Sequence, residues 1–263
     1  MRSLLPTTIT RTTAEEPVVR IENVSKSFVS EDKLVAVLEH VSFNVTKEFL
    51  CIVGPSGCGK STLLRMISGL DQPTKGQVYF HGKPVTGPTP KMGMVFQTFA
   101  LIPWKTVLEN VEMGLAWVQM PEEDRRKRSM KFIQDVGLDG FESSYPKELS
   151  GGMKQRVGIA RALALEPEVL LMDEPFSSLD ALTAEGLRRE VLDIWKDPQF
   201  STNSVIMVTH NVQEAVSMAD TVIVMSPRPG KVIDNVRIDM ERPRDQRDPR
   251  FFDFVDRIIS KIS

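Results

Sequence analysis

The chain has 263 residues, of which 41% are hydrophobic and 26% are charged, so it can bury a large core without disulfides or metal ions. Its 33 basic and 35 acidic residues give a net charge of −2, which favours neither nucleic acid nor an anionic lipid surface as a partner. The apolar runs are far shorter than the ~18 residues that span a bilayer, which excludes a membrane channel, and two cysteines, Cys51 and Cys58, are typical of a reducing compartment.

The chain begins with a polar, threonine-rich segment. Residues 1–17 do not resemble a secretory signal, because Pro6 interrupts the apolar pair Leu4 and Leu5. We therefore expect residues 1–17 to form a flexible arm.

Strand-like runs and helical patterns alternate after this segment. Apolar and β-branched runs predict strands at residues 18–24, 49–53, 77–80, 92–96, 169–172, 205–208 and 221–225, and a helix at residues 60–68. Such runs suit strands that are buried on both faces of a largely parallel sheet. The pattern predicts an α/β core of the nucleotide-binding type.

The pattern between about residues 98 and 164 is helical. One predicted face carries Val107, Leu108, Val111, Leu115 and Val118. A second helix is predicted at residues 122–136, with an inner stripe of Met130, Ile133 and Val136. We interpret this region as a helical insertion in the α/β core.

A last helix is predicted within residues 237–263. Its apolar face consists of Phe251, Phe254, Val255, Ile258, Ile259 and Ile262. We expect this helix to dock on the core and not to form a second domain.

Residues 54–61 match the phosphate-binding pattern G-x-x-x-x-G-K-[ST], between a predicted strand and a predicted helix. The glycines let backbone N–H groups turn toward phosphate oxygens, and the helix N-terminus adds positive charge. We expect Lys60 to reach the β- and γ-phosphates and Ser61 to ligate Mg²⁺. Cys58 is interpreted as a variable position with an available thiol and no catalytic role. The predicted nucleotide contacts of this loop are Gly54, Pro55, Ser56, Gly57, Cys58, Gly59, Lys60, Ser61 and Thr62.

The predicted strand at residues 169–172 is followed by Asp173 and Glu174. Successive side chains of a strand point to opposite sides, so these carboxylates are expected to have different roles. Asp173 suits the Mg²⁺ shell beside Ser61, and Glu174 suits the general base that polarises the attacking water.

A second anion-binding helix end is predicted inside the helical insertion. Ser150, Gly151 and Gly152 stand at the start of a predicted helix, in the segment Leu-Ser-Gly-Gly-Met-Lys-Gln-Arg. Together with the phosphate loop, this segment resembles the signature of the ATP-binding subunit of an ABC transporter, and the resemblance covers about residues 18–236.

The resemblance implies a fold and further site residues. The fold is a P-loop NTPase, an ABC ATPase cassette with an N-terminal β subdomain and an inserted helical subdomain. Gln97 resembles the Q-loop glutamine that contacts Mg²⁺ and water, Asp180 belongs to the D-loop, His210 resembles the switch histidine, and Phe28 the aromatic that stacks on adenine. Met153 departs from the Gln that many relatives carry, and we expect a modest consequence.

In this family each ATP lies between the phosphate loop of one cassette and the signature segment of another. The resemblance therefore implies ATP and Mg²⁺ as cofactors, catalysis by Glu174 and His210, and a head-to-tail dimer with a second copy or a paralogue. It further implies transmembrane permease subunits, an indirect solute-binding protein, no nucleic acid, and a peripheral location on the cytoplasmic face of the inner membrane.

Several segments are similar to the nitrate, sulfonate and taurine importer branch, including residues 100–111, 149–156 and 225–231; Ala184 departs from that branch, where Arg is common. Residues 99–104 offer an apolar seat for the permease, although Trp104 could equally belong to the core.

The alternatives are a soluble ABC ATPase of DNA repair or translation, an exporter subunit, and a nucleotide-dependent scaffold without turnover. The chain holds neither a long coiled coil nor two cassettes, exporters often carry fused membrane helices, and Glu174 argues against a scaffold.

Overall fold

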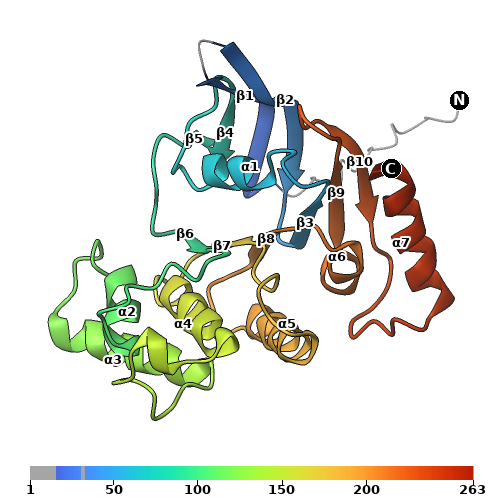
Figure 1. Cartoon of the computed structure of the whole chain (residues 1–263). Coiled ribbons are helices and arrows are strands. Elements are labelled where there is room, and N and C mark those ends of the chain that lie inside the picture. The colour runs from blue at the N-terminus through green and yellow to red at the C-terminus, as the bar shows by residue number, and fades with distance from the viewer. Residues whose placement is uncertain (1–15, 31–32, 263) are drawn as a thin grey trace, which may run out of the picture.

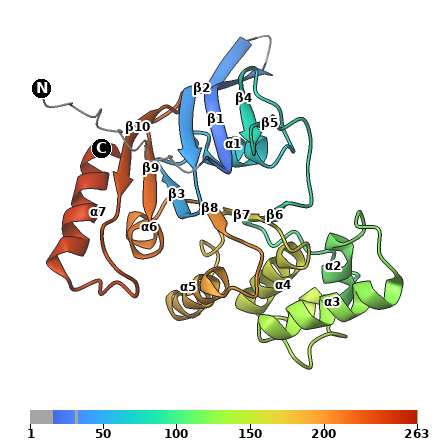
Figure 2. The same ribbon diagram turned by 180° about the vertical axis from the view of Figure 1, so that it is seen from behind.

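The structure is a computed structural model that describes residues 16–30 and 33–262. The flexible arm expected at residues 1–17 therefore falls almost entirely outside the described residues. Two β-sheets and seven α-helices make up the described part of the chain. Figure 1 shows the smaller sheet above the larger one, with the helical insertion to one side, and Figure 2 shows the same arrangement from behind.

The smaller sheet is antiparallel and has the strand order β2-β1-β4-β5. Its strands are β1 (Val19–Ser30), β2 (Lys33–Val45), β4 (Lys75–Phe80) and β5 (Lys83–Pro84). β1 is longer than the strand predicted at residues 18–24, and neither β2 nor β5 is among the predicted strands. Several register shifts between β1 and β2 interrupt the alternation of side chains, which hides β2 from a period-two reading of the sequence.

The larger sheet has the strand order β10-β9-β3-β8-β7-β6. Its strands are β3 (Phe49–Val53), β6 (Met92–Val95), β7 (Val169–Asp173), β8 (Ser204–Thr209), β9 (Thr221–Met225) and β10 (Val232–Arg237). All neighbours pair in parallel except β10, which pairs antiparallel to β9 at one edge. The parallel sheet confirms the expected α/β core. β10 was not predicted, because its side chains alternate between exposed and buried and only Val236 is fully buried.

The helices of the α/β core are α1 (Lys60–Ile67), α5 (Ala181–Lys196), α6 (Val212–Met218) and α7 (Pro249–Ile262). The helical insertion contains α2 (Val107–Gly114), α3 (Glu122–Asp135), a 3₁₀ turn (Pro146–Glu148) and α4 (Gly151–Leu163). Among the described residues, none of these helices combines the length and the apolar character needed to cross a membrane.

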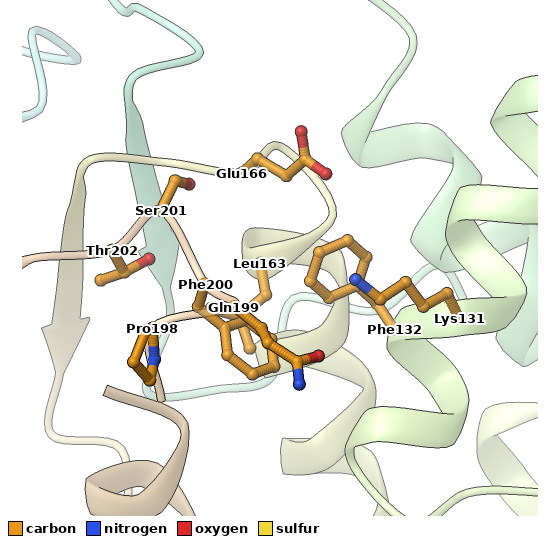
Figure 3. A pocket seen from close by; sticks show the side chains of 9 residues that line it. All are labelled: Lys131, Phe132, Leu163, Glu166, Pro198, Gln199, Phe200, Ser201 and Thr202. Atoms are coloured by element: carbon orange, nitrogen blue, oxygen red, sulfur yellow. The ribbon is translucent and has the colours of Figure 1, made fainter. Parts of the chain in front are cut away.

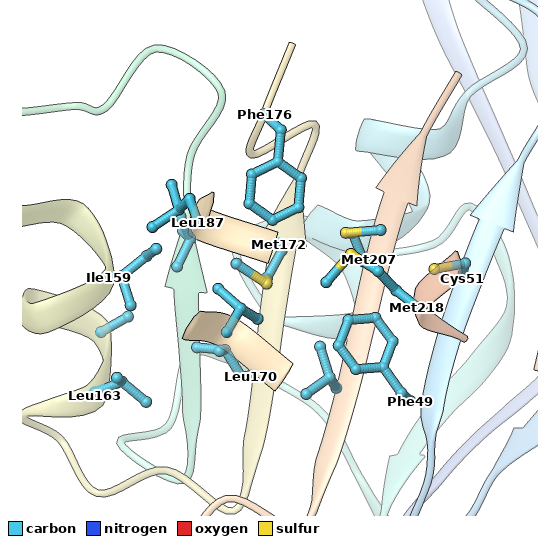
Figure 4. Packing of buried hydrophobic residues seen from close by; sticks show 14 of the residues in the cluster. Phe49, Cys51, Ile159, Leu163, Leu170, Met172, Phe176, Leu187, Met207 and Met218 are labelled. Carbon is cyan, nitrogen blue, oxygen red and sulfur yellow. The ribbon is translucent and has the colours of Figure 1, made fainter. Parts of the chain in front are cut away.

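Alternate residues of the central strands belong to two hydrophobic clusters. Phe49 and Cys51 of β3 face a cluster that includes residues of α4, α5 and α6, and Figure 4 shows part of it around Met172 and Met207. Leu50, the neighbour of Phe49, faces the second cluster, formed with α1 and the smaller sheet. Burial on both faces explains why these strands are continuous apolar runs.

Three details of the helices differ from the expectations. α2 ends at Gly114 instead of continuing to Val118, because tight turns follow. At Gly114 the helix packs so closely on α4 that a Cβ would lie 2.6 Å from the carbonyl oxygen of Arg161. Met130 of α3 is exposed, and Ser129 and Phe132 are buried in its place. On α7, Ile259 is exposed, whereas Phe251, Val255 and Ile258 are buried.

Candidate functional site

The phosphate loop joins β3 to the N-terminus of α1. Gly57 and Gly59 have φ angles of +76° and +105°, in the left-handed region that favours glycine. A Cβ on Gly59 would lie 2.7 Å from Cδ2 of Leu38, so the loop also needs glycine at this point for close packing on β2. The backbone conformation therefore explains the glycine at the fixed position 59 of the motif, and Gly57 meets the same backbone requirement at a variable position.

Lys60 begins α1, and its side chain crosses the loop. Its Nζ donates hydrogen bonds to the carbonyl oxygens of Gly54 at 2.8 Å and Pro55 at 3.1 Å. Cys58 is fully buried, and this burial raises the pKa of its thiol. The expectation of an available thiol at Cys58 is therefore wrong, since Cys58 contributes to the packing below the loop.

Ser61 and Asp173 meet at the end of β7. The hydroxyl of Ser61 donates a hydrogen bond of 2.8 Å to Oδ1 of Asp173. Burial raises the pKa of Asp173, and the Ser61 hydrogen bond opposes this shift only in part. The carboxylate is thus a partly buried negative charge beside the phosphate loop.

Glu174 follows β7 with a φ angle of +43° and points to a different set of partners. Its Oε2 lies 2.9 Å from Nδ1 of His210, which follows β8. The same oxygen accepts a hydrogen bond of 3.4 Å from Nε2 of Gln97, which follows β6. The structure therefore gives Asp173 and Glu174 different partners, as predicted, but Glu174 lies beyond the end of β7, so its left-handed turn and not strand alternation sets its direction. The turn brings Glu174 to Gln97 and His210.

These groups border a pocket of about 440 Å³. Its lining residues are Val37, Ser56, Gly57, Gly59, Lys60, Ser61, Thr62, Gln97, Glu174 and Arg228. Some of the predicted site residues are neighbours of the pocket, in sequence or by contact, and do not line it. These are Gly54, Pro55, Cys58, Asp173 and His210.

Val37 and Arg228 line the pocket although neither was predicted as a site residue. Arg228 lies between β9 and β10, and its Nε donates to the carbonyl oxygen of Ala36 at 3.2 Å. The sequence feature that could have identified Arg228 is its position after β9, a strand of the parallel sheet. Ligands of such sheets bind beyond the carboxyl ends of the strands. Val37 belongs to β2, the strand that the sequence did not reveal.

The predicted signature residues lie outside this pocket. Ser150 caps α4, and its Oγ accepts a hydrogen bond of 3.3 Å from the N–H of Met153, while Gly151 is exposed. Asp180 caps α5 by accepting a hydrogen bond of 3.0 Å from the N–H of Thr183, and hydrogen bonds from Thr183 lower the pKa of Asp180. Within one chain these groups are not among those that face the phosphate loop.

Phe28 also does not line the pocket. It belongs to β1, and 43% of its surface is exposed. Nζ of Lys26 lies 5.0 Å from the centroid of its ring. The ring is accessible for stacking.

A second cavity of about 300 Å³ lies between α3, the end of α4 and the loop that follows α5. Figure 3 shows the rings of Phe132 and Phe200 within it. It contains none of the predicted site residues, so the phosphate-loop pocket is the candidate site.

Comparisons with known proteins agree with this geometry. Residues 38–177 match the family model described as ABC transporter. The nitrate import ATP-binding protein NrtD of Synechocystis is 44% identical over 254 residues, which are 93% of this chain and 94% of NrtD. The aliphatic sulfonates import ATP-binding protein SsuB of Bacillus cereus is 41% identical over 245 residues, 93% of this chain and 95% of SsuB.

Solved structures of ATP-binding cassettes share the fold. The dimeric post-hydrolysis structure of the cassette MJ0796 with ADP and Pi has a TM-score of 0.73 and 34% identity, and covers 85% of this chain and 100% of that cassette. The matches to NrtD and SsuB extend over nearly the whole chain. The phosphate loop predicts a nucleotide ligand, and the MJ0796 cassette was solved with ADP and Pi. The chain therefore belongs to the ABC transporter family and is an ATP-binding cassette with ATPase activity.

Proposed function

We propose that this cassette powers the import of a small anion of the nitrate or sulfonate type through separate permease subunits. The relatives named for nitrate import and for aliphatic sulfonate import support this proposal, because both match almost end to end. The observation that carries the catalytic part is the meeting of Gln97 and His210 at Glu174, beside the phosphate loop.

The residues present fit Mg²⁺. Ser61 and Asp173 supply a hydroxyl and a carboxylate oxygen next to the phosphate loop, and these are ligand types that Mg²⁺ prefers. No group of three or more His, Cys, Asp or Glu side chains in the described parts of the chain could hold a metal ion. Mg²⁺ that binds together with a nucleotide usually has only one or two protein ligands, because phosphate oxygens and water complete its coordination shell. When bound, Mg²⁺ would neutralise charge on the phosphates, and Ser61, Asp173 and Gln97 are the residues that would hold it.

Glu174 is the proposed general base for hydrolysis. It accepts a proton from the attacking water as the water oxygen bonds to the γ-phosphorus and the bond to the bridging oxygen of ADP breaks. His210 donates toward the γ-phosphate and orients the carboxylate of Glu174 through the 2.9 Å contact. Lys60 binds the β- and γ-phosphates, and the exposed ring of Phe28 stacks on adenine.

Two cassettes are proposed to pair head-to-tail. The exposed residues Ser150 and Gly151 at the start of α4 and the Asp180 cap lie outside the pocket of their own chain, so they are available to the nucleotide of a second chain. The dimeric structures of MJ0796 support this arrangement. The partner is a second copy or a paralogue, and the closed pair binds two nucleotides.

We propose the domain division that the resemblance implies. Residues 18–236 form the cassette, residues 98–164 its helical insertion, and residues 237–263 a segment that docks through α7. In support, α7 packs against α6, β9 and β10, so its buried face lies on the α/β core.

The permease is proposed to dock on one side of the helical insertion. An apolar groove of about 630 Å³ runs between the β6 edge and α2, and Met94, Phe96, Met113 and Trp117 are among its lining residues. Trp117 is 90% exposed, and Trp104, in the segment predicted as the seat, is 75% exposed. Apolar surface of this kind is typical of a protein interface, and we assign it to a short helix of the permease on the cytoplasmic face of the membrane.

Purification from native membranes tests this function. The chain, solubilised with detergent and captured by a tag, is expected to bring a polytopic membrane protein with it. Addition of nitrate or an alkanesulfonate with the corresponding binding protein should then raise the ATPase rate of the purified complex. Capture of ribosomal or DNA-repair proteins in place of a polytopic protein would contradict the import function.

A further inference from the structure

The segment from Gln97 to Thr106 links the catalytic edge of the larger sheet to the helical insertion. Gln97 follows β6 and contacts Glu174, and Thr106 caps α2. Between them, Phe99 and Ala100 have φ angles of +61° and +47°. This left-handed conformation is unfavourable for residues that carry a Cβ, so neighbouring groups must hold it.

Arg161 of α4 provides one such restraint. Its two terminal nitrogens donate to the carbonyl oxygens of Ala100 at 2.6 Å and Phe99 at 2.9 Å. Burial lowers the pKa of Arg161, and no carboxylate of the described residues forms an ion pair with it. Hydrogen bonds from a charged donor are stronger than neutral ones, and here the two carbonyls accept them from the partly buried guanidinium group.

Asn110 of α2 restrains the rest of the segment. It is 1% exposed, and its Oδ1 accepts the N–H of Ile102 at 2.7 Å. Its Nδ2 donates to the carbonyl oxygens of Ile102, Lys105 and Thr106 at 3.2, 3.0 and 2.8 Å. Residues 99–106 are thus fastened to α4 and α2, both of which belong to the helical insertion.

We propose that Arg161 is a positioning residue for ATP hydrolysis, which acts by fixing the Phe99–Ala100 turn so that Gln97 reaches Glu174. Because residues 99–106 are held to the insertion, a displacement of the insertion is transmitted to Gln97 through Thr98. The side chain of Arg161 donates to these two carbonyls and not to the phosphate loop or to Glu174. The inference rests on the role proposed above for Gln97.

The test compares kcat and KM for ATP in the full-length chain with Arg161→Met and Gln97→Ala, singly and together. Arg161→Met is expected to lower kcat by about tenfold to hundredfold, because misplacement of a positioned group by about 1 Å has effects of that size. KM for ATP should change little, since the phosphate loop is untouched. Arg161→Lys keeps the charge and can reach one carbonyl, so kcat should lie between Arg161→Met and the unchanged chain.

The double variant distinguishes positioning from general stability. If Arg161 acts through Gln97, Arg161→Met should lower kcat no further once Gln97 is Ala. Arg244→Met is the matched control. Arg244 is also partly buried and donates to backbone carbonyls, those of Val216, Ala219, Ile238 and Met240, far from Gln97 in the sequence. The Arg244→Met substitution should lower the melting temperature of the protein without changing kcat.

Additive losses in the double variant would overturn the inference and leave the role of Gln97 standing. An unchanged kcat in both Arg161 variants, with a lowered kcat in Gln97→Ala, would overturn it as well. If Gln97→Ala alone leaves kcat unchanged, the proposed role of Gln97 fails and the inference fails with it. If Arg161→Met does not fold, Arg161→Lys with Gln97→Ala provides the same comparison.

Discussion

The hydroxyl of Ser61 donates a 2.8 Å hydrogen bond to Oδ1 of Asp173, and this contact joins the phosphate loop to the last residue of β7. The two residues are 112 positions apart in the chain. The parallel pairing of β3 with β8 and of β8 with β7 brings the carboxyl ends of β3 and β7 to the same edge of the sheet. A hydroxyl and a carboxylate thus lie together beside the phosphate loop, at the carboxyl ends of the strands where ligands of parallel sheets bind.

Asp173→Asn should raise the melting temperature of the nucleotide-free protein. Burial raises the pKa of Asp173 above its ordinary value of 3.8, so the charged form is less stable in the folded protein than in the unfolded chain. The folded state therefore loses stability as the pH rises through the raised pKa, and the substitution removes that loss. Thermal unfolding at several pH values measures the effect.

The difference in melting temperature between Asp173→Asn and the unchanged protein should be present at neutral pH and should shrink as the pH falls toward 3.8. Asp245→Asn is the control, because it removes an exposed carboxylate whose pKa is lowered by the hydrogen bond from Arg247, and it should not raise the melting temperature. In the presence of Mg²⁺ and ATP, the additional stabilisation should be smaller in Asp173→Asn. A lower melting temperature for Asp173→Asn at neutral pH would contradict this account of Asp173.

Two inactive variants should complement each other. Lys60→Ala removes the ammonium group for the phosphates and is expected to weaken ATP binding by about tenfold to hundredfold. Ser150→Arg should block the helix end that is proposed to bind the nucleotide of the other chain. In a mixed dimer, the phosphate loop of the Ser150→Arg chain meets the intact signature of the Lys60→Ala chain, so one complete site forms. ATPase activity of the mixture, compared with each variant alone, measures this; a mixture without activity would argue against head-to-tail pairing.

Trp104→Asp should prevent assembly with the permease. Trp104 is 75% exposed, so the substitution places a charge on the surface without leaving a cavity in the core. ATPase activity of the isolated chain is expected to stay within twofold, roughly the scale of a neutral surface substitution. Phe252→Asp, on the exposed side of α7, is the control and should still co-purify with the permease. Equal recovery of the permease with both variants would show that Trp104 lies outside the interface.

Local sequence patterns predicted the catalytic edge of the fold. The phosphate loop combines glycines with fixed backbone requirements, as Gly57 and Gly59 show, and such a requirement leaves a strong signal in the sequence. Different roles for Asp173 and Glu174 were predicted from the alternation of side chains along a strand. The two carboxylates do have different partners, but Glu174 lies beyond the end of β7 in a left-handed turn that the sequence did not predict.

Contacts that depend on tertiary structure could not be predicted in this way. Val37 reaches the pocket from β2, whose alternation is broken by register shifts, and Arg228 reaches it from the loop between β9 and the edge strand β10. The hydrogen bonds of Arg161 to residues 99 and 100 span about sixty positions and involve only backbone acceptors, so the residues contacted carry no side-chain signal. Met130 shows the same limit, because packing against α4 selects Ser129 and Phe132 instead.

The most direct test of the catalytic account is the ATPase rate of Glu174→Gln, measured together with its affinity for ATP. The amide keeps the size of Glu174 but cannot accept the proton of the attacking water, so the rate should fall by about 10²- to 10⁴-fold. ATP should still bind, because Lys60 and the phosphate loop are unchanged, and the ATP-bound dimer should persist. A Glu174→Gln protein that hydrolyses ATP at the rate of the unchanged chain would contradict the assignment of Glu174 as the general base.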